Sequence, residues 1–236
     1  MSSVPPQGPG SVPPPPPPPP PYVPSPAGPG LAWETQAIGP ESFLETAKMF
    51  IMAPGQAWKL TRETGDYTRP LLFGVIVGWV GLVFNAIWST MFGAGLMRML
   101  PAQYSQFNRF GGGSVLAQVI LGPLLVAIGL FIGAAIFHVS FMLVGALTSS
   151  KSQFEGTFRV VSYSSIAHLA YIVPVVGGLA ALVWRVYLML LGAQQLHKTT
   201  QSKALLGILL PMLICCVCAG IGIAFAGAAM MRVFSR

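Results

Sequence analysis

Charged residues are absent from four long intervals of the chain, and this absence constrains the fold more than any other feature. No Lys, Arg, Asp or Glu occurs in residues 70–97, 110–150, 160–184 or 204–231. A helix needs about 20 predominantly apolar residues to cross a bilayer, and each interval is long enough. Only helices and closed barrels satisfy their backbone hydrogen bonds inside hydrocarbon. The chain is therefore predicted to be an all-α, polytopic membrane protein.

Breaks within these intervals predict how many helices cross the membrane. Pro174 and the pair Gly177–Gly178 interrupt the apolar stretch that precedes His197. Proline and glycine disfavour a continuous helix, so we expect a bundle of five transmembrane helices, where an unbroken stretch would give four. The expected spans cover residues 71–96, 114–147, 159–173, 179–196 and 204–231.

The positions of Lys and Arg predict the orientation of these spans. Eight of these residues flank the spans on the same side as residues 41–69, and four lie on the other side. Arg185 lies inside the fourth span and is not counted. Because cytoplasmic loops carry the excess of positive charge, we expect a cytoplasmic N-terminus and, with five spans, a C-terminus on the opposite side.

The first 40 residues differ sharply in composition from the rest. Residues 1–40 contain 16 of the 22 prolines. Such a segment buries too little apolar surface to offset the entropy of ordering, so we predict a disordered cytoplasmic tail. A proline run forms an extended polyproline II helix, which either binds a partner protein or acts as a spacer. The candidate partner-binding residues are Pro13, Pro14, Pro15, Pro16, Pro17, Pro18, Pro19, Pro20 and Pro21.

Residues 41–69 are predicted to form an amphipathic collar at the membrane interface. Ser42 has a glutamate three residues later, the spacing of a capping box, so a helix is expected to begin at Ser42. Pro54 breaks that helix, and a second short helix then carries Trp58 beside basic residues. Tryptophan among Lys and Arg is typical of the headgroup layer. Residues 70–236 are predicted to form the transmembrane domain.

Acidic residues are too few and too poorly placed for most chemistry. The chain has six Asp and Glu residues, and none lies inside a predicted span. Ion-coupled transport and general acid–base catalysis usually depend on such carboxylates. The sequence also lacks a glycine-rich phosphate loop and the common hydrolase motifs. We therefore expect no enzymatic activity, no cofactor and no metal. The net charge of +7 is spread over isolated residues, so no nucleic-acid partner is expected.

Four polar residues inside the predicted spans are candidate functional residues. A charge inside a bilayer is costly unless it is paired or near the interface. Arg185 therefore either reaches the headgroups or a structural partner, or it binds a substrate or lipid. His138 and His168 either ligate a metal or haem from facing helices or bridge helices by hydrogen bonds. Asn85 is expected to form an interhelical hydrogen bond.

A series of short motifs along residues 41–231 resembles the Yip1 family. In that family a tyrosine opens the third span, a Pro-x-x-Gly break follows it, a tryptophan follows the break, and a histidine precedes the last span. A proline before a tryptophan and an Asp-x-x-x-Pro segment precede the first span. The matching residues here are Pro54, Asp66, Pro70, Tyr163, Pro174, Gly177, Trp184 and His197.

The resemblance implies five spans, a cytoplasmic N-terminus and no known catalytic activity. Eukaryotic members lie in Golgi and ER membranes and contact Rab GTPases. The segment Asp66-Tyr-Thr-Arg-Pro70 departs from the eukaryotic Asp-Leu-x-Gly-Pro pattern. The chain is more similar to the bacterial branch, which implies a bacterial inner membrane and does not imply Rab binding.

Two functional hypotheses follow from these observations. The first is a non-enzymatic membrane scaffold or adaptor that acts through helix and lipid contacts, with the Pro-rich tail as a tether or ligand. The alternative is a transporter, channel or lipid-handling protein with a polar path near Arg185. A dry, packed bundle would favour the first hypothesis, and a polar cavity that reaches Arg185 would favour the second. The expected partners are membrane lipids, a protein bound by the tail, and further copies of this chain or other subunits.

Overall fold

The structure is a computed structural model that describes residues 30–99 and 115–234. Its regular elements within these ranges are all helices, which confirms the predicted fold class. The helices are α1 (Ala32–Thr35), α2 (Pro40–Met52), α3 (Pro54–Leu60), α4 (Thr68–Met99), α6 (Val115–Leu143), α7 (Gln153–Ser164), the 3-10 helix η2 (Ser165–Ile172), α8 (Gly177–His197) and α9 (Gln201–Phe234).

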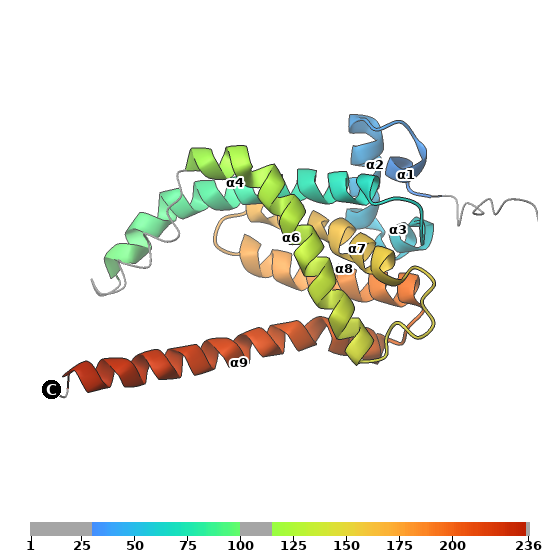
Figure 1. The fold of residues 1–236 in the computed structure, drawn as a ribbon. Helices are drawn as coiled ribbons and strands as arrows, with labels where there is room; N and C mark the ends of the chain where they lie inside the picture. The colour runs from blue at the N-terminus through green and yellow to red at the C-terminus, as the bar shows by residue number, and fades with distance from the viewer. Residues whose placement is uncertain (1–29, 100–114, 235–236) are drawn as a thin grey trace, which may run out of the picture.

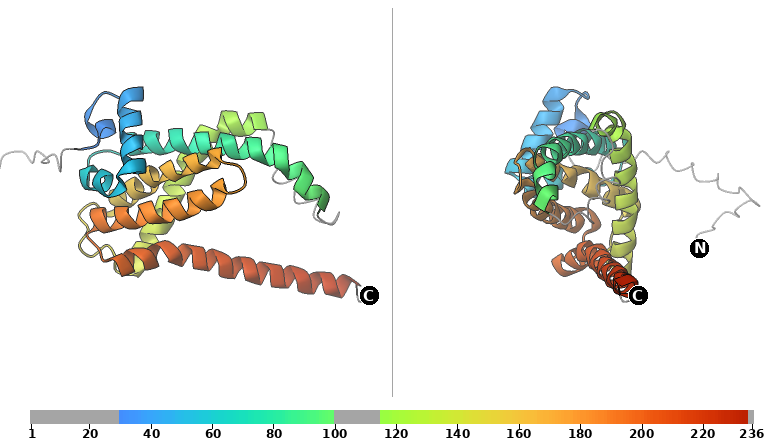
Figure 2. Two further views of the ribbon diagram at one scale, coloured as in Figure 1. Left: turned by 180° about the vertical axis from the view of Figure 1, so that it is seen from behind. Right: turned by 90° about the vertical axis from the view of Figure 1, so that its left-hand side faces the viewer.

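The helices form a bundle with a cap at one end and a diverging arm. α7 and η2 run in line through the bundle and pack against α4, α6 and α8 (Figure 1). α1–α3 lie at the end of the bundle where α4 and α7 begin (Figures 1 and 2). α9 contacts α6 and α8 near its start, and its C-terminal half runs away from the other helices (Figure 2).

The break predicted at Pro174 is confirmed and has a steric cause. η2 ends at Ile172 and α8 begins at Gly177, so the chain reverses between them. A Cβ atom at Gly177 would lie 2.3 Å from the backbone oxygen of Ala170. Only glycine allows the backbone to approach so closely at this turn.

The predicted number of spanning helices is too high by one. Within the described ranges, four helices are long and apolar enough to cross a membrane, namely Thr68–Phe92, Leu116–Leu143, Gly177–His197 and Gln201–Gly222. The predicted third span is instead the combined rod of α7 and η2. It carries Glu155 and Arg159 in its first half, and nine of the 12 residues of α7 are buried. Other helices surround this rod, so it does not have to be apolar along its whole length.

A described helix precedes the collar that the sequence predicts. Residues 30–40 were assigned to the Pro-rich tail, yet α1 lies there with Trp33 2% exposed and Glu34 4% exposed. The predicted capping box at Ser42 is also wrong, because α2 begins at Pro40 with Gly39 as its N-cap. The Ser42 hydroxyl donates instead to the backbone oxygens of Ala37 and Gly39. Two collar helices divided at Pro54 are confirmed.

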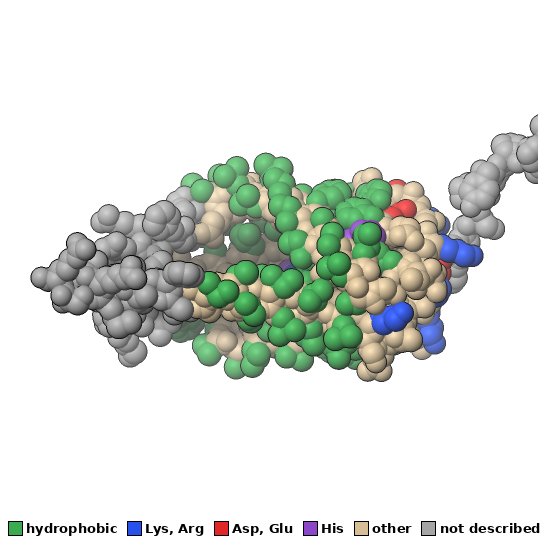
Figure 3. Space-filling view, turned by 60° about the horizontal axis from the view of Figure 1, so that its bottom comes forward, with side chains coloured by type: hydrophobic (Ala, Val, Ile, Leu, Met, Phe, Trp, Pro, Cys, Tyr) green, Lys and Arg blue, Asp and Glu red, His purple; other side chains and the backbone are tan. Residues whose placement is uncertain are grey.

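The surface divides into an apolar flank and a charged end. Hydrophobic side chains cover the sides of the bundle in Figure 3, while Lys, Arg, Asp and Glu gather at the end that carries α1–α3. This division is typical of a protein whose flank faces lipid and whose end faces water.

Candidate functional site

A partly polar concavity among the described residues lies between α4, α6, η2 and α8. It has a volume of about 380 Å³. Its polar lining comes from Asn85 on α4, from Ser165, His168 and Tyr171 on η2, and from Arg185 on α8. Three of the candidate residues predicted from the sequence, Asn85, His168 and Arg185, are therefore brought together. We refer to this cavity as the Arg185 pocket.

The Arg185 guanidinium turns into the bundle and does not extend along its helix toward the headgroups. Its Nη1 atom donates to His168 Nε2 at 2.8 Å. The imidazole of His168 in turn stacks on the ring of Tyr171, with ring centroids 5.6 Å apart. Because Nε2 accepts this bond, the imidazole is neutral and does not balance the charge of the arginine.

The rest of the Arg185 pocket is apolar, and the pocket is partly open. Leu82, Val126 and Leu130 contribute to this apolar lining, and no Asp or Glu of the described residues lines the cavity. Gly129 belongs to the lining and is exposed near the middle of α6. A Cβ atom at Gly129 would meet no atom within 4 Å. The pocket is thus open at the surface beside α6, within a predicted span.

His138 belongs to a different cluster and does not share a site with His168. Its Nδ1 atom lies 3.1 Å from Thr157 Oγ1, which lies 3.1 Å from Nε2 of His197. Nδ1 of His197 lies 2.8 Å from the Ser150 hydroxyl. The two predicted histidines therefore act as helix bridges, and no group of three or more potential ligands among the described residues could hold a metal.

A buried ionic cluster joins the N-terminal helices to the bundle. The side chain of Arg159, 1% exposed, pairs with Glu34 of α1 and, at 2.9 Å, with Glu155. Its Nη2 atom also donates to the backbone oxygen of Asp66 at 2.8 Å. The Tyr163 hydroxyl donates to Glu34 Oε1 at 2.9 Å.

This ionic cluster was not found from the sequence. The partner Glu34 of Arg159 comes from α1, outside every predicted span. The one available signal was the pair Trp33-Glu34, an aromatic and an acid in a segment otherwise rich in proline.

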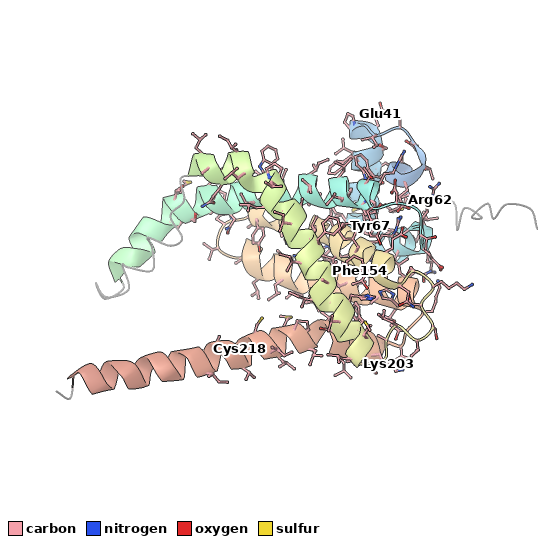
Figure 4. All side chains as sticks on the ribbon, in the orientation of Figure 1. Glu41, Arg62, Tyr67, Phe154, Lys203 and Cys218 are labelled. Carbon is pink, nitrogen blue, oxygen red and sulfur yellow. The ribbon has the colours of Figure 1, made fainter. Side chains whose placement is uncertain are left out.

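Two further arginines lie beside the ionic cluster and belong to the same cavity as its members. Arg62 and Arg69 line a cavity of about 240 Å³ together with Glu34, Asp66 and Arg159. Figure 4 shows Arg62 beside α3 at the capped end. Nη1 of Arg69 donates to the backbone oxygens of Trp33 and Gln36, so its charge serves to hold α1 in place.

Most of the remaining motif residues lie where one helix ends or the next begins. Pro54 begins α3, Pro70 lies in the first turn of α4, and Pro174 lies between η2 and α8. His197 is buried at the end of α8, and Trp184 packs against Tyr187 with ring centroids 5.7 Å apart. The proline run 13–21 lies outside the described residues.

The α3 helix docks on α8 through a tryptophan and a glycine. Trp58 is 1% exposed, and a Cβ atom at Gly192 would lie 2.8 Å from its ring. Phe50 and Tyr163 pack on the same tryptophan, with ring centroids 5.0 and 6.3 Å away. The predicted role of Trp58 at the headgroups is thus replaced by a role in packing.

Comparison with known proteins assigns the family, because a family model matches most of the chain. The family model described as the Yip1 domain matches residues 48–223, from α2 to the apolar part of α9. No curated protein and no solved structure matches. The matched segment includes the ionic cluster residue Arg159, the docking pair Trp58 and Gly192, and the whole Arg185 pocket. This chain is a multi-pass membrane protein that belongs to the Yip1 domain family.

Proposed function

We propose that this protein is a non-enzymatic membrane scaffold that presents its charged end to partner proteins. The observation that carries the proposal is the attachment of α1–α3 to the bundle by the buried cluster of Glu34, Arg159 and Tyr163. A surface that only covers lipid headgroups does not need to be fixed by a buried ion pair. Here the two partners are 125 residues apart in sequence, and both side chains are almost fully buried. Such an attachment gives the charged end one defined shape, which a docking surface requires.

The chemistry available at this end suits binding rather than reaction. Its buried acids are engaged, because Glu34 accepts from Arg159, Tyr163 and the backbone nitrogen of Arg62. Exposed side chains of both signs lie around it, among them Glu41 and Lys59. Mixed exposed charges favour specific and reversible association with a protein surface.

The charged end is proposed to face the cytoplasm of a bacterial cell, with the protein in the inner membrane. Apart from Arg185, the described Lys and Arg side chains lie on α2, α3 and α7, in the segments 61–67 and 144–152, and at the ends of the spanning helices. Figure 3 shows such residues at the end that carries α1–α3. Positive residues are concentrated on the cytoplasmic side of membrane proteins. The Pro-rich tail would then leave Gly30 into the cytoplasm, as a tether or a ligand for a partner.

Site-specific photo-crosslinking in native membranes tests the scaffold. A photoreactive amino acid at Glu41 or at Lys59 is expected to give the same discrete protein adduct, because both side chains are exposed at the charged end. The same residue at Leu124, exposed on the apolar flank, is the control and is expected to give no such adduct. Loss of the adduct when Pro13–Pro21 is changed to Gly-Ser would assign the contact to the tail. Absence of any adduct specific to the charged end would refute the scaffold.

A second candidate function is favoured by the Arg185 pocket. The bundle is not packed throughout, because a partly polar cavity reaches Arg185 inside the candidate span Gly177–His197. This observation supports a lipid-handling or transport role beside the scaffold. Solute or lipid transfer in proteoliposomes that is lost in Arg185→Met would establish that role, and transfer that is unchanged in this variant would exclude Arg185 from it.

A further inference from the structure

We infer that the Arg185 pocket is a binding site for an oxyanion, of the kind carried by a phospholipid headgroup. The inference names the ligand class of the second candidate function and rests on the same pocket, but it requires binding only and not transfer.

The first argument is the unbalanced charge of Arg185. It lies eight residues after Gly177, the first residue of α8, and 12 residues before its last, His197. None of the three ion pairs among the described residues includes it, and no acid lines its pocket. A charge in this setting is stable only with a compensating group nearby. A ligand that brings negative charge supplies that group.

The second argument is the geometry of the donors around the cavity. A guanidinium has five N–H donors in a planar fork, and the described contacts use one of them, on His168. The fork matches the paired oxygens of a phosphate or carboxylate. Asn85 and Tyr171 add an amide and a hydroxyl to the same lining. All of these groups can donate to an oxyanion, and none repels it.

The third argument is the shape of the cavity and its apolar half. A volume of about 380 Å³ falls in the range of ligand pockets, roughly 300–1,000 Å³. Leu82, Val126 and Leu130 line the same cavity as the polar groups, so the cavity suits a molecule with one charged end and one apolar part. The opening beside Gly129 lies on the flank, where the bilayer is the surrounding medium. A lipid therefore reaches the pocket without crossing the charged end.

Lipid binding to the purified full-length protein tests the inference. The protein in detergent micelles is titrated separately with phosphatidylglycerol, with zwitterionic phosphatidylcholine and with inorganic phosphate, and bound ligand is counted by native mass spectrometry. We expect phosphatidylglycerol to bind at least about tenfold more tightly than phosphatidylcholine, because a charged hydrogen-bonded pair changes affinity by about that factor. Binding of inorganic phosphate alone would support the oxyanion site and assign it to a soluble anion.

Two variants and one control separate the pocket from general surface charge. Arg185→Met removes the charge and Gly129→Leu fills the opening while leaving the charge in place. Both are expected to lower phosphatidylglycerol affinity by about tenfold or more. Lys151→Met removes one exposed positive charge elsewhere and is expected to leave the affinity unchanged. Wild-type affinity in Gly129→Leu and in a folded Arg185→Met, or equal binding of both lipids by the wild type, would overturn the inference. Binding without transfer in proteoliposomes would keep the site and reject the transport role.

Discussion

At the scale of single residues, Arg159 joins parts of the chain that are far apart in sequence. It connects α7 to Glu34 of α1 and to the backbone of Asp66. The removal of one partner from a buried pair leaves a charge that neither water nor protein compensates. The attachment of α1–α3 to the bundle therefore depends on this one side chain far more than on any exposed ion pair.

We predict that Arg159→Ala lowers the free energy of unfolding by about 3–5 kcal/mol. The control is Lys198→Ala, which breaks the exposed pair of Lys198 with Glu63, where the two side chains are 48% and 28% exposed. Its expected cost is about 0–1 kcal/mol. Denaturant titration of both variants in mixed micelles measures the difference. Equal losses would show that the buried pair has no special role.

A second prediction concerns the hydroxyl that bridges two histidines. Thr157→Val keeps the shape of the side chain but leaves ring nitrogens of His138 and His197 without their partner. The expected cost is about 1–3 kcal/mol in the same titration, because buried unpaired polar groups are unfavourable. Thr148→Val, on an exposed residue, is expected to change little. A Thr157→Val protein as stable as the wild type would indicate that water replaces the hydroxyl.

At the scale of helices, the packing of α3 against α8 requires a residue without a side chain at position 192. The ring of Trp58 occupies the space where a Cβ atom of Gly192 would lie, 2.8 Å away. Trp58 itself is held between Phe50 and Tyr163, so it has little freedom to move aside. The position of α3 on the bundle is thus set by a glycine on another helix.

We predict that Gly192→Ala loosens α3 from the bundle. The backbone amides of α3 are expected to exchange with solvent at least about tenfold faster, which corresponds to about 1.4 kcal/mol of lost protection. Gly55→Ala, in α3 itself, is the matched control, since a Cβ atom there meets nothing within 4 Å. Hydrogen exchange with mass spectrometry resolves the two cases. Unchanged protection of α3 in Gly192→Ala would contradict the docking described here.

The long helices could be predicted from the sequence, and the contacts between them mostly could not. Missing charge marked residues 71–96 and 204–231, which lie within α4 and α9. A contact between the elements that carry His168 and Arg185 was also within reach, because these elements flank the turn at Pro174, six residues after His168 and 11 residues before Arg185. The pairing of Glu34 with Arg159 was not, since no local pattern specifies which of several buried groups meet across 125 residues.

At the scale of the whole molecule, the number of crossings depends on the rod formed by α7 and η2. Its 12 and 8 residues give a length of about 34 Å at about 1.5 Å per α-helical and 2.0 Å per 3-10 residue. This length matches the roughly 30 Å of bilayer hydrocarbon. In Figure 1 the rod lies alongside α8, between the same two ends of the bundle. It is not one of the four apolar helices that could span a membrane, but its length would allow a fifth crossing shielded from lipid by the other helices.

We therefore predict that the two chain ends lie on opposite sides of the membrane. Reporter enzymes active only in the cytoplasm or only outside it, fused to either end of the full chain, measure this directly. A cytoplasmic N-terminal reporter and an external C-terminal reporter are expected. Both reporters in one compartment would mean that α7 and η2 do not traverse the bilayer and that the charge asymmetry was misinterpreted.

A binding site at the depth of Arg185 would also sense the membrane potential. One elementary charge moved across the whole bilayer exchanges about 2.3 kcal/mol with each 100 mV of membrane potential. A group eight residues into a helix of 21 lies partway through that electric field. An anion that enters beside this arginine would travel through the same fraction of the voltage drop. Occupancy of the pocket would then rise or fall when respiration energises the membrane, with no change in the anion's concentration.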